Sequence, residues 1–371
     1  MIYKFGDIAN NVTEKRSPKP EDSQNYIGLE HLDSGSLYVN RYGIDVELKG
    51  DKLVMHKGDV LLGKRNAYLR RAAIAPHDGL FSAHGMILRP KDVIASEFFP
   101  FFIASDKFFD DVIRISVGGL SPTVNWKDLK ELEFDLPSLA EQKVLAEKLW
   151  AAYEVKQSYL KMIAATEEMV KAQFVEMTGD PRTNPKSWPV KQLPELATYS
   201  IGLTYKPENI SEDGTIVLRS GNIQNSKIDL TDVVRVNCPI KESIYVRKND
   251  ILMCSRNGSA ALVGKVAQIK DIEEPMTYGA FMTVIRSDYS DYLYLYFQSK
   301  DFREQVSTGK SSTMNQITQN MLDKITLPLP GEDIIKKLSE ILHQADKSIS
   351  ELRKSVDAID KVIKSLINEN L

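Results

Sequence analysis

Two long stretches of the chain have the apolar pattern of paired helices. The second stretch runs from Glu332 to Leu371 and contains neither proline nor glycine. Its apolar residues recur at alternating steps of three and four, which is typical of a coiled-coil seam. These positions are Leu342, Ala345, Ile349, Leu352, Val356, Ile359, Ile363 and Leu366.

The first stretch, from Ser138 to Thr178, also lacks proline and glycine and carries a weaker seam in the same register. Three of its positions are polar, and its main pairing candidates are Leu149, Tyr159, Ile163 and Val170. Each helix of about 40 residues would be roughly 60 Å long. Two matching stripes in one chain most simply pack on each other, so the pattern predicts an antiparallel coiled coil with a globular domain at each end. The alternative is that each helix packs on its own globular domain, but a strict 3.5-residue repeat favours helix-on-helix packing.

The segments that precede the two helices resemble each other. "GDVLLGKRN" (58–66) matches "NDILMCSRN" (249–257), and "SPTVNWKDLKELEFDLP" (121–137) matches "MNQITQNMLDKITLPLP" (314–330). The matching segments are shifted by roughly 190 residues, far too long a period for a solenoid. The chain therefore contains two copies of one domain.

Proline and glycine mark the domain boundaries. The first helix is expected to end at Gly179, and three prolines in "TGDPRTNPKSWPV" (178–190) exclude helix there. The predicted fold class is α+β, with two repeated strand-rich domains of mixed α and β structure, each followed by a long helix. The predicted segments are a first domain (1–137), a first helix (138–178), a linker (179–189), a second domain (190–330) and a second helix (331–371).

Composition narrows the class of protein. The chain has 371 residues, of which 42% are hydrophobic and 27% charged, as in a folded domain. No apolar run approaches the roughly 20 residues of a membrane span, and no apolar signal core opens the chain. The two cysteines suit a reducing cytoplasm, and the histidines form no metal-ligand pattern, so we expect a cytoplasmic protein without a metal site. The net charge of -3 argues neither for nor against DNA binding, because a DNA-binding protein needs only a local basic surface.

One short motif resembles part of a nucleotide-binding loop but lacks that loop's first glycine. Gly309, Lys310 and Ser311 match the end of a phosphate-binding loop, but the first glycine of that loop is replaced by Glu304. The chain also lacks a dinucleotide-binding glycine motif, a nucleophile elbow and the Asp/Asn-Pro-Pro-aromatic motif of amino-methyltransferases. The sequence therefore predicts no catalytic site.

Two polar loops in each repeat have the side chains of DNA-binding proteins. Arginine and asparagine read guanine and adenine edges, while lysine and hydroxyl groups hold phosphates. The first loop follows the apolar strand of each repeat, and the second precedes a short helix whose start favours a phosphate. The candidates are Lys64, Arg65, Asn66, Arg70, Ser121, Thr123 and Lys127 in the first half, and Ser255, Arg256, Asn257, Lys310, Ser311, Ser312, Thr313 and Asn315 in the second. The simpler interpretation of any single residue is that exposed loops are polar, but the duplicated Arg-Asn element favours a function.

These repeated segments, in this order, resemble the specificity subunits of type I restriction-modification systems. "LPSLAEQK" (136–143) is similar to the family's entry into its spacer helix, whereas "LPLPGEDIIKK" (327–337) departs from it at Ile334 and Ile335. The resemblance covers essentially the whole chain.

The resemblance implies a role and a set of partners. Two target recognition domains would each read one half of a bipartite sequence in double-stranded DNA, and the helices would set the spacing between the halves. The chain itself would have no catalysis and no bound cofactor. It would carry two methyltransferase subunits that use S-adenosylmethionine and, in full complexes, restriction subunits that use ATP and Mg²⁺; no membrane would be involved.

Two other functions remain open from the residues alone. A coiled-coil scaffold that organises partners without reading DNA shares the seams and the missing chemistry. An enzyme with scattered catalytic residues would show turnover by the isolated chain, although no motif with a mechanism supports it.

Overall fold

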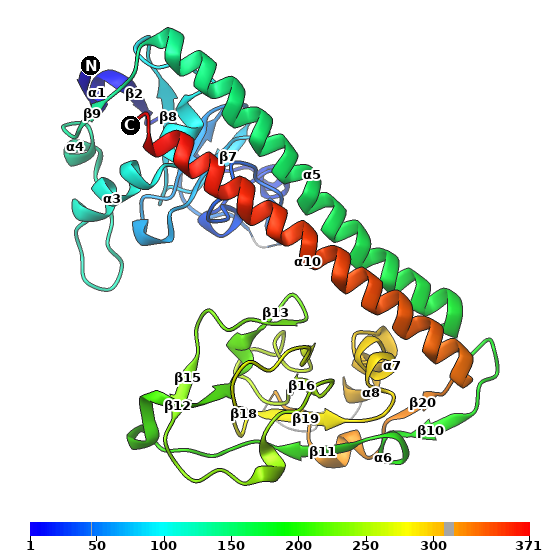
Figure 1. The fold of residues 1–371 in the computed structure, drawn as a ribbon. Helices are drawn as coiled ribbons and strands as arrows, with labels where there is room; N and C mark the ends of the chain where they lie inside the picture. Colours follow the sequence, from blue (N-terminus) through cyan, green and yellow to red (C-terminus); the bar gives the residue numbers. More distant parts are fainter. Residues whose placement is uncertain (46, 308–314) are drawn as a thin grey trace. The chain divides into compact units, whose positions relative to one another are not determined.

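The computed structural model describes residues 1–45, 47–307 and 315–371 and divides the chain into two compact units. The first unit contains Met1–Met162 and Leu352–Leu371, and the second contains Ile163–Glu351 (Figure 1). The long helices α5 (Leu139–Thr178) and α10 (Glu332–Asn368) each contribute to both units. The units therefore divide within the helices, whereas the sequence boundaries treat each helix as a separate segment.

The first unit is built on a four-stranded antiparallel sheet of order β2-β8-β5-β6. A three-stranded sheet of order β3-β4-β7 and the pair β1-β9 accompany it. The strands are β1 (Ile2–Lys4), β2 (Ala9–Val12), β3 (Lys15–Arg16), β4 (Lys52–Met55), β5 (Val60–Leu62), β6 (Ala72–Ile74), β7 (Gly79–Phe81), β8 (Met86–Pro90) and β9 (Glu133–Asp135). The short helices are α1 (Phe5–Ile8), α2 (Phe99–Ile103), α3 (Asp106–Arg114) and α4 (Trp126–Leu129).

The second unit repeats the four-stranded order as β11-β19-β16-β17 and the pair β1-β9 as β10-β20. Its three-stranded sheet β15-β12-β18 differs, because β12 and β18 are parallel whereas β3-β4-β7 is antiparallel throughout, and a hairpin β13-β14 is added. Its strands are β10 (Val190–Gln192), β11 (Thr198–Ile201), β12 (Ile210–Leu218), β13 (Ile223–Gln224), β14 (Lys227–Ile228), β15 (Val234–Val236), β16 (Ile251–Cys254), β17 (Val266–Gln268), β18 (Met276–Tyr278), β19 (Met282–Arg286) and β20 (Thr326–Pro328). Its short helices are α6 (Leu193–Leu196), α7 (Ser290–Tyr296), α8 (Lys300–Ser307) and α9 (Gln319–Leu322). The matching order of the two four-stranded sheets confirms the predicted α+β fold and the duplication.

The repeated Gly-Asp and Asn-Asp dipeptides have a structural cause. Asp59 and Asp250 are buried just before the central strands β5 and β16. Arg89 Nε lies 2.6 Å from an Asp59 carboxylate oxygen, and Arg286 Nη2 lies 2.6 Å from one of Asp250. Each arginine sits in the strand next to the aspartate, so the same ion pair between a buried carboxylate and a partly exposed arginine joins the turn to the sheet in both units. A turn with positive φ precedes each aspartate, at Gly58 (φ 93°) and Asn249 (φ 69°).

The long helices pack antiparallel in each unit. In the first unit Leu149 and Tyr153 of α5 share a buried core with Ile367 of α10, and Lys156 Nζ lies 2.6 Å from Asp360 Oδ1. In the second unit the later part of α5 packs with the beginning of α10, where Phe174 and Leu342 share a core. Both cores also contain residues of the sheets and short helices. The helices therefore pack on each other and on the strand-rich domains, which combines the two packing alternatives.

Burial along the helices shows the actual seam. The predicted positions Leu149, Ile163, Val170, Leu342, Ile349 and Val356 are buried, while Tyr159, Leu352, Ile359, Ile363 and Leu366 are half-buried. Tyr153, Phe174 and Ile367 are buried as well, although the strict heptad register places none of them in the seam.

Candidate nucleic-acid interface

The first unit joins the two polar loops that the sequence singles out. The segment after β5 and the segment before α4 pair as a short antiparallel ladder, in which Arg65 and Thr123 face each other. Asn66 donates its backbone N–H to the carbonyl oxygen of Pro122 at 2.7 Å, and Val124 donates to the carbonyl of Lys64 at 3.0 Å. Candidate residues that lie almost sixty positions apart in the chain therefore form one surface.

The second unit contains the same ladder. Arg256 faces Gln316, Asn257 donates its N–H to the Asn315 carbonyl at 3.4 Å, and Ile317 donates to the Ser255 carbonyl at 2.8 Å. The backbone therefore presents Arg65 and Arg256 at equivalent places, and both side chains are exposed. The remaining candidates Lys310, Ser311, Ser312 and Thr313 lie outside the described residues.

Side chains around Arg65 form a small polar patch. Arg65 Nη2 donates to Ser121 Oγ at 3.3 Å, and Thr123 Oγ1 donates to the Ser121 carbonyl at 3.1 Å. Lys127 is exposed in α4, on the same segment. Burial and the nearby charge of Lys15 lower the pKa of Lys64 from its ordinary value. The patch offers guanidinium and hydroxyl groups, which suit base edges and phosphates.

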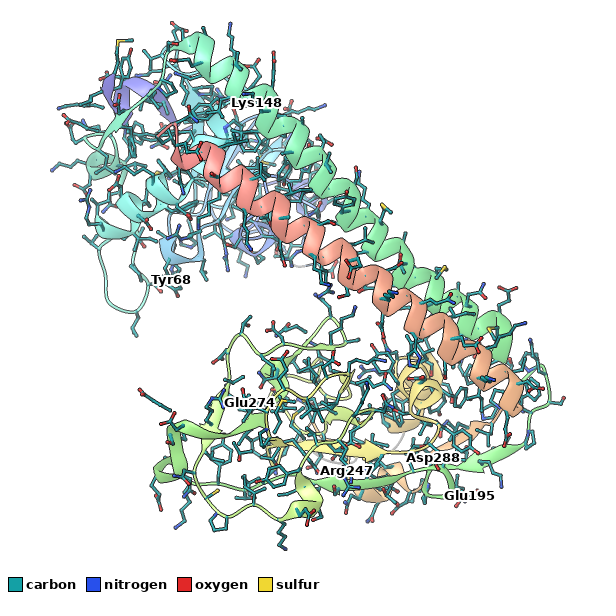
Figure 2. The ribbon with its side chains drawn as sticks, in the orientation of Figure 1. Tyr68, Lys148, Glu195, Arg247, Glu274 and Asp288 are labelled. Atoms are coloured by element: carbon teal, nitrogen blue, oxygen red, sulfur yellow. The ribbon has the colours of Figure 1, made fainter. Side chains whose placement is uncertain are left out.

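Asn66 and Arg70 are constrained more than the sequence suggests. Asn66 adopts a left-handed backbone conformation (φ 55°) and starts the short 3₁₀ turn that presents the exposed Tyr68 (Figure 2). The buried Oδ1 of Asn66 has no hydrogen-bond partner among the described atoms. The Arg70 guanidinium is bound by two carboxylates of α3, with Nη1 at 2.7 Å from Asp106 Oδ1 and Nη2 bonded to Asp110. Arg70 therefore ties a turn to α3.

Around Arg256 the neighbouring candidates are used internally. Ser255 is buried and donates to Thr283 Oγ1 at 2.6 Å, and Asn257 Nδ2 donates to Ser220 Oγ at 3.0 Å. Asn315 Nδ2 reaches the Gly258 carbonyl at 3.2 Å. These contacts shape the loop and leave Arg256 as its exposed arginine. An aromatic ring, Phe281, lies under the Arg256 guanidinium, and no sequence signal marks it.

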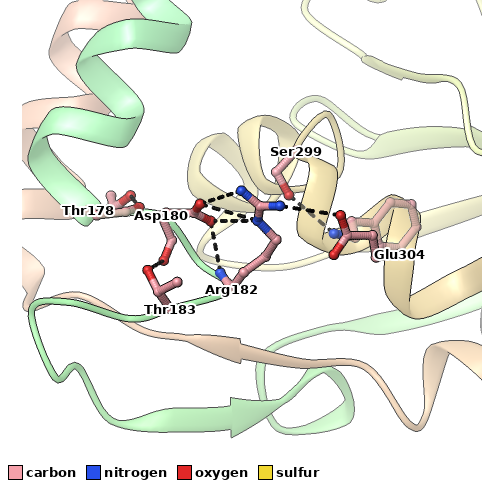
Figure 3. Close-up of polar contacts among 8 residues, drawn as sticks. Thr178, Asp180, Arg182, Thr183, Ser299 and Glu304 are labelled. Carbon is pink, nitrogen blue, oxygen red and sulfur yellow. Dashed lines mark hydrogen bonds and ion pairs between the residues drawn. The ribbon is translucent and has the colours of Figure 1, made fainter.

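The segment before Gly-Lys-Ser does not form a phosphate cradle. Glu304 lies within helix α8, and its Oε1 lies 3.4 Å from Arg182 Nη1 (Figure 3). Arg182 Nη2 lies 2.7 Å from Asp180 Oδ2, and this guanidinium holds the pKa of the Asp180 carboxyl below its ordinary value. The cluster joins the linker after α5 to α8. A helix occupies the place where a nucleotide-binding loop would need its first glycine.

Two further observations limit the chemistry within the described ranges. No group of three or more His, Cys, Asp or Glu side chains there is arranged to hold a metal ion. No described helix is both long and apolar enough to cross a bilayer.

The family model of the type I restriction modification DNA specificity domain matches residues 1–158 and again residues 185–359. The chain belongs to this family. The two matches correspond to the two repeats. The scaffold alternative is not favoured, because the matching model describes a DNA specificity domain in both halves.

Relatives and solved structures extend the comparison. The EcoKI specificity subunit of Escherichia coli K12 is 29% identical over 177 residues, which cover 44% of this chain and 38% of the relative. The match to the StySPI specificity subunit of Salmonella potsdam is also 29% identical and spans 45% of this chain and 39% of that subunit, so the chain spans well under half of these two relatives. The MjaVIII specificity subunit of Methanocaldococcus jannaschii is 22% identical, and this match covers 99% of this chain and 91% of that subunit.

The fold has solved counterparts among type I systems. The crystal structure of an S subunit from M. genitalium aligns with a TM-score of 0.53 at 14% identity, covering 99% of this chain and 94% of that one. A structure described in terms of complex assembly of the type I R-M system aligns with a TM-score of 0.51 at 18% identity, covering 100% of this chain and 97% of that one. At these identities the likeness concerns the fold alone.

Proposed function

We propose that this chain is the specificity subunit of a type I restriction-modification complex and reads a bipartite target in double-stranded DNA. The observation that carries the proposal is the duplicated ladder, which presents Arg65 in one unit and Arg256 in the other at equivalent places. A duplicated scaffold with different surrounding side chains suits two half-sites of different sequence. Arginine is the commonest reader of guanine, and its fork can bind O6 and N7 together.

The roles within each loop follow from the contacts. Arg65 and Arg256 are proposed to reach base edges, while Lys127 and the hydroxyls of Ser121 and Thr123 contact the phosphate backbone. Asn66 and Asn257 are proposed to shape their loops and to contact DNA only through atoms that the loop leaves accessible. The chain is proposed to have no catalytic activity of its own.

Matched arginine substitutions in the complex with the methyltransferase subunits test the proposal. Arg65→Ala should relax sequence discrimination in one half-site and Arg256→Ala in the other, each by about 1–3 kcal/mol at the affected base pair. Arg41→Ala is a suitable control, because Arg41 is an exposed arginine outside both ladders that pairs with Asp33 at 2.7 Å. Methylome sequencing of cells that carry the complex would define the two half-sites. Equal binding of all duplexes by the wild-type complex would contradict the proposed function.

We further propose that methyltransferase subunits dock on the exposed face of α5. Val155, Met162 and Met169 follow each other at seven-residue steps and are exposed by 46%, 51% and 46%. Matching positions of α10 hold Ser348, Ser355 and the exposed Val362, so α10 has one apolar residue where α5 has three. An apolar stripe with this period suits a partner helix. The methyltransferase would then bind S-adenosylmethionine, and in complete complexes a restriction subunit would bind ATP with Mg²⁺.

A pair of matched charges tests this surface. Met162→Glu should weaken assembly with the methyltransferase, because it places a carboxylate in an apolar contact. Ser348→Glu adds the same charge at an exposed serine of α10, the counterpart of Val155, and should leave assembly nearly unchanged. Mass photometry of the two mixtures would measure the stoichiometry. Equal assembly by both variants would reject the α5 face as the docking site.

A further inference from the structure

Phe281 is an exposed aromatic residue attached directly to one of the proposed DNA readers. It precedes β19, and 60% of its surface is accessible. Its ring centroid lies 5.4 Å from the Arg256 guanidinium carbon. Its carbonyl oxygen accepts the N–H groups of both Ser255 and Arg256 at 3.0 Å. The backbone and the ring of Phe281 therefore both act on Arg256.

This arrangement restricts Arg256 without covering it. One side of its backbone is bonded to Phe281, and the other faces Gln316 in the ladder. The electron-rich face of an aromatic ring attracts a guanidinium group, and arginine stacks on such faces readily. A long side chain loses rotamer freedom when it binds, so a side chain that is already held loses less. The stack therefore reduces the entropy cost of contacting a base.

The described residues of the first unit do not repeat this arrangement. Leu88 lies opposite Val60 as Ile285 lies opposite Ile251, so the strand register places His84 where the second unit has Phe281. His84 is exposed, and its backbone N–H donates to Ser82 Oγ at 3.3 Å. The Arg65 guanidinium is held through the hydroxyl of Ser121 instead.

We propose that Phe281 is a positioning residue that holds the Arg256 guanidinium in its DNA-reading conformation and thereby sharpens discrimination in the second half-site alone. This inference rests on the proposed function. An exposed ring contributes little to the core, so its main effect falls on Arg256. The two recognition domains would then differ in rigidity at equivalent readers.

The test uses the complete complex with the methyltransferase subunits and duplexes that carry single base-pair changes in either half-site. Phe281→Ala should lower the discrimination at the base pair read by Arg256 by about two- to fivefold, the size of an exposed cation–π contact. Phe281→Leu keeps an apolar side chain but removes the π face, so it should show the same loss. Phe281→Tyr and Phe281→Trp should retain discrimination. Discrimination in the first half-site is the internal control and should not change.

A double-mutant cycle separates positioning from direct contact. Adding Phe281→Ala to Arg256→Ala should have no further effect if Phe281 acts through the arginine. A loss that persists in the Arg256→Ala background, or full discrimination by Phe281→Leu, would overturn the inference while leaving the proposed function intact. A wild-type complex that discriminates no base pair would overturn both. Thermal melting of each complex identifies variants that fail to fold, and Phe281→Leu decides the outcome if Phe281→Ala is one of them.

Discussion

Tyr153 of α5 and Asp346 of α10 occupy matching places, each fourteen residues after the first residue of its helix. In the first unit Tyr153 is buried among aromatic rings, 5.2 Å from Tyr38 and 5.9 Å from Trp150 between centroids. Its hydroxyl accepts the backbone N–H of Leu37 at 2.7 Å. The helix is therefore joined to the domain mainly by apolar packing.

In the second unit this contact between the long helix and its domain, here called the joint, is formed by charged side chains. Asp346 lies 3.1 Å from Lys270 and 3.9 Å from Lys227, while Asp291 lies 3.2 Å from His343 Nε2 and 3.9 Å from Lys270. These groups connect β14, α7 and the segment after β17 to α10. Exposed or half-exposed ion pairs are weak and are screened by salt, whereas packed aromatic rings are not. Duplication has thus kept the backbone plan while the chemistry that fastens the helix has changed.

The largest expected effect comes from removing the aromatic joint. Tyr153→Ala should destabilise the first unit by about 3–5 kcal/mol, because it opens a cavity in a packed core. Tyr153→Phe removes only the hydrogen bond to Leu37 and should cost about 1 kcal/mol. Hydrogen–deuterium exchange of peptides from the first unit would measure both. Equal effects of the two substitutions would show that packing does not dominate this joint.

A second comparison concerns the residues before β8 and β19. Gly85→Ala should destabilise the first unit by about 1–3 kcal/mol, since its Cβ would overlap the Phe81 ring. Phe281→Ala, which also changes the residue directly before a strand, should alter stability by less than about 0.5 kcal/mol, because this side chain is exposed. Urea-induced unfolding, followed separately in each unit by pulsed proteolysis, would compare them. A larger loss for Phe281→Ala would contradict the assignment of this ring to Arg256.

The charged joint should show a smaller effect than removal of the aromatic ring, and one that depends on salt. Asp346→Ala removes the carboxylate that Lys270 and Lys227 face and should cost about 1 kcal/mol at low salt, since all three groups are partly exposed. The cost should shrink at about 1 M salt, where the Debye length is about 3 Å. The cost of Tyr153→Phe should hardly depend on salt. Exchange rates in the second unit at two salt concentrations would test this, and a salt-independent loss would indicate packing instead of charge.

Much of the fold follows from the sequence, because the sequence contains heptads and repeated segments. The heptads predict the two long helices, and the repeated segments predict the duplicated domain. The register of the first seam is less accurate: the strict offset selects Ala152 and Gln173, whereas Tyr153 and Phe174 are buried. A straight helix drifts by about 20° per heptad against a 3.5-residue repeat. The buried face of α5 contacts a domain core as well as α10, and a heptad repeat describes only the contact with α10.

The candidate site could be predicted in part. The repeat identifies both polar loops in each half, and the ladder between Arg65 and Thr123 brings them together. The internal hydrogen bonds of Ser255 and Asn257 could not be foreseen, because their partners come from distant strands and turns. The contacts of Arg70 could not be foreseen either, because its carboxylate partners lie on α3. Only tertiary contacts separate polar side chains that shape a loop from those that remain exposed.

The sequence by itself determined the duplication, the strand-rich domains and the long helices. Periodicity is visible within a short stretch of chain, and the repeated turns are visible when the two halves are compared. The tertiary structure alone decided how each joint is fastened and how each arginine is held. Tyr153 and Asp346 stand at matching places with opposite chemistry, and Gly85 and Phe281, each directly before a strand, meet different neighbours. Their roles depend on neighbours that are remote in the chain, such as Phe81 behind Gly85 and Arg256 above Phe281. A linear pattern contains those residues but not the contacts between them.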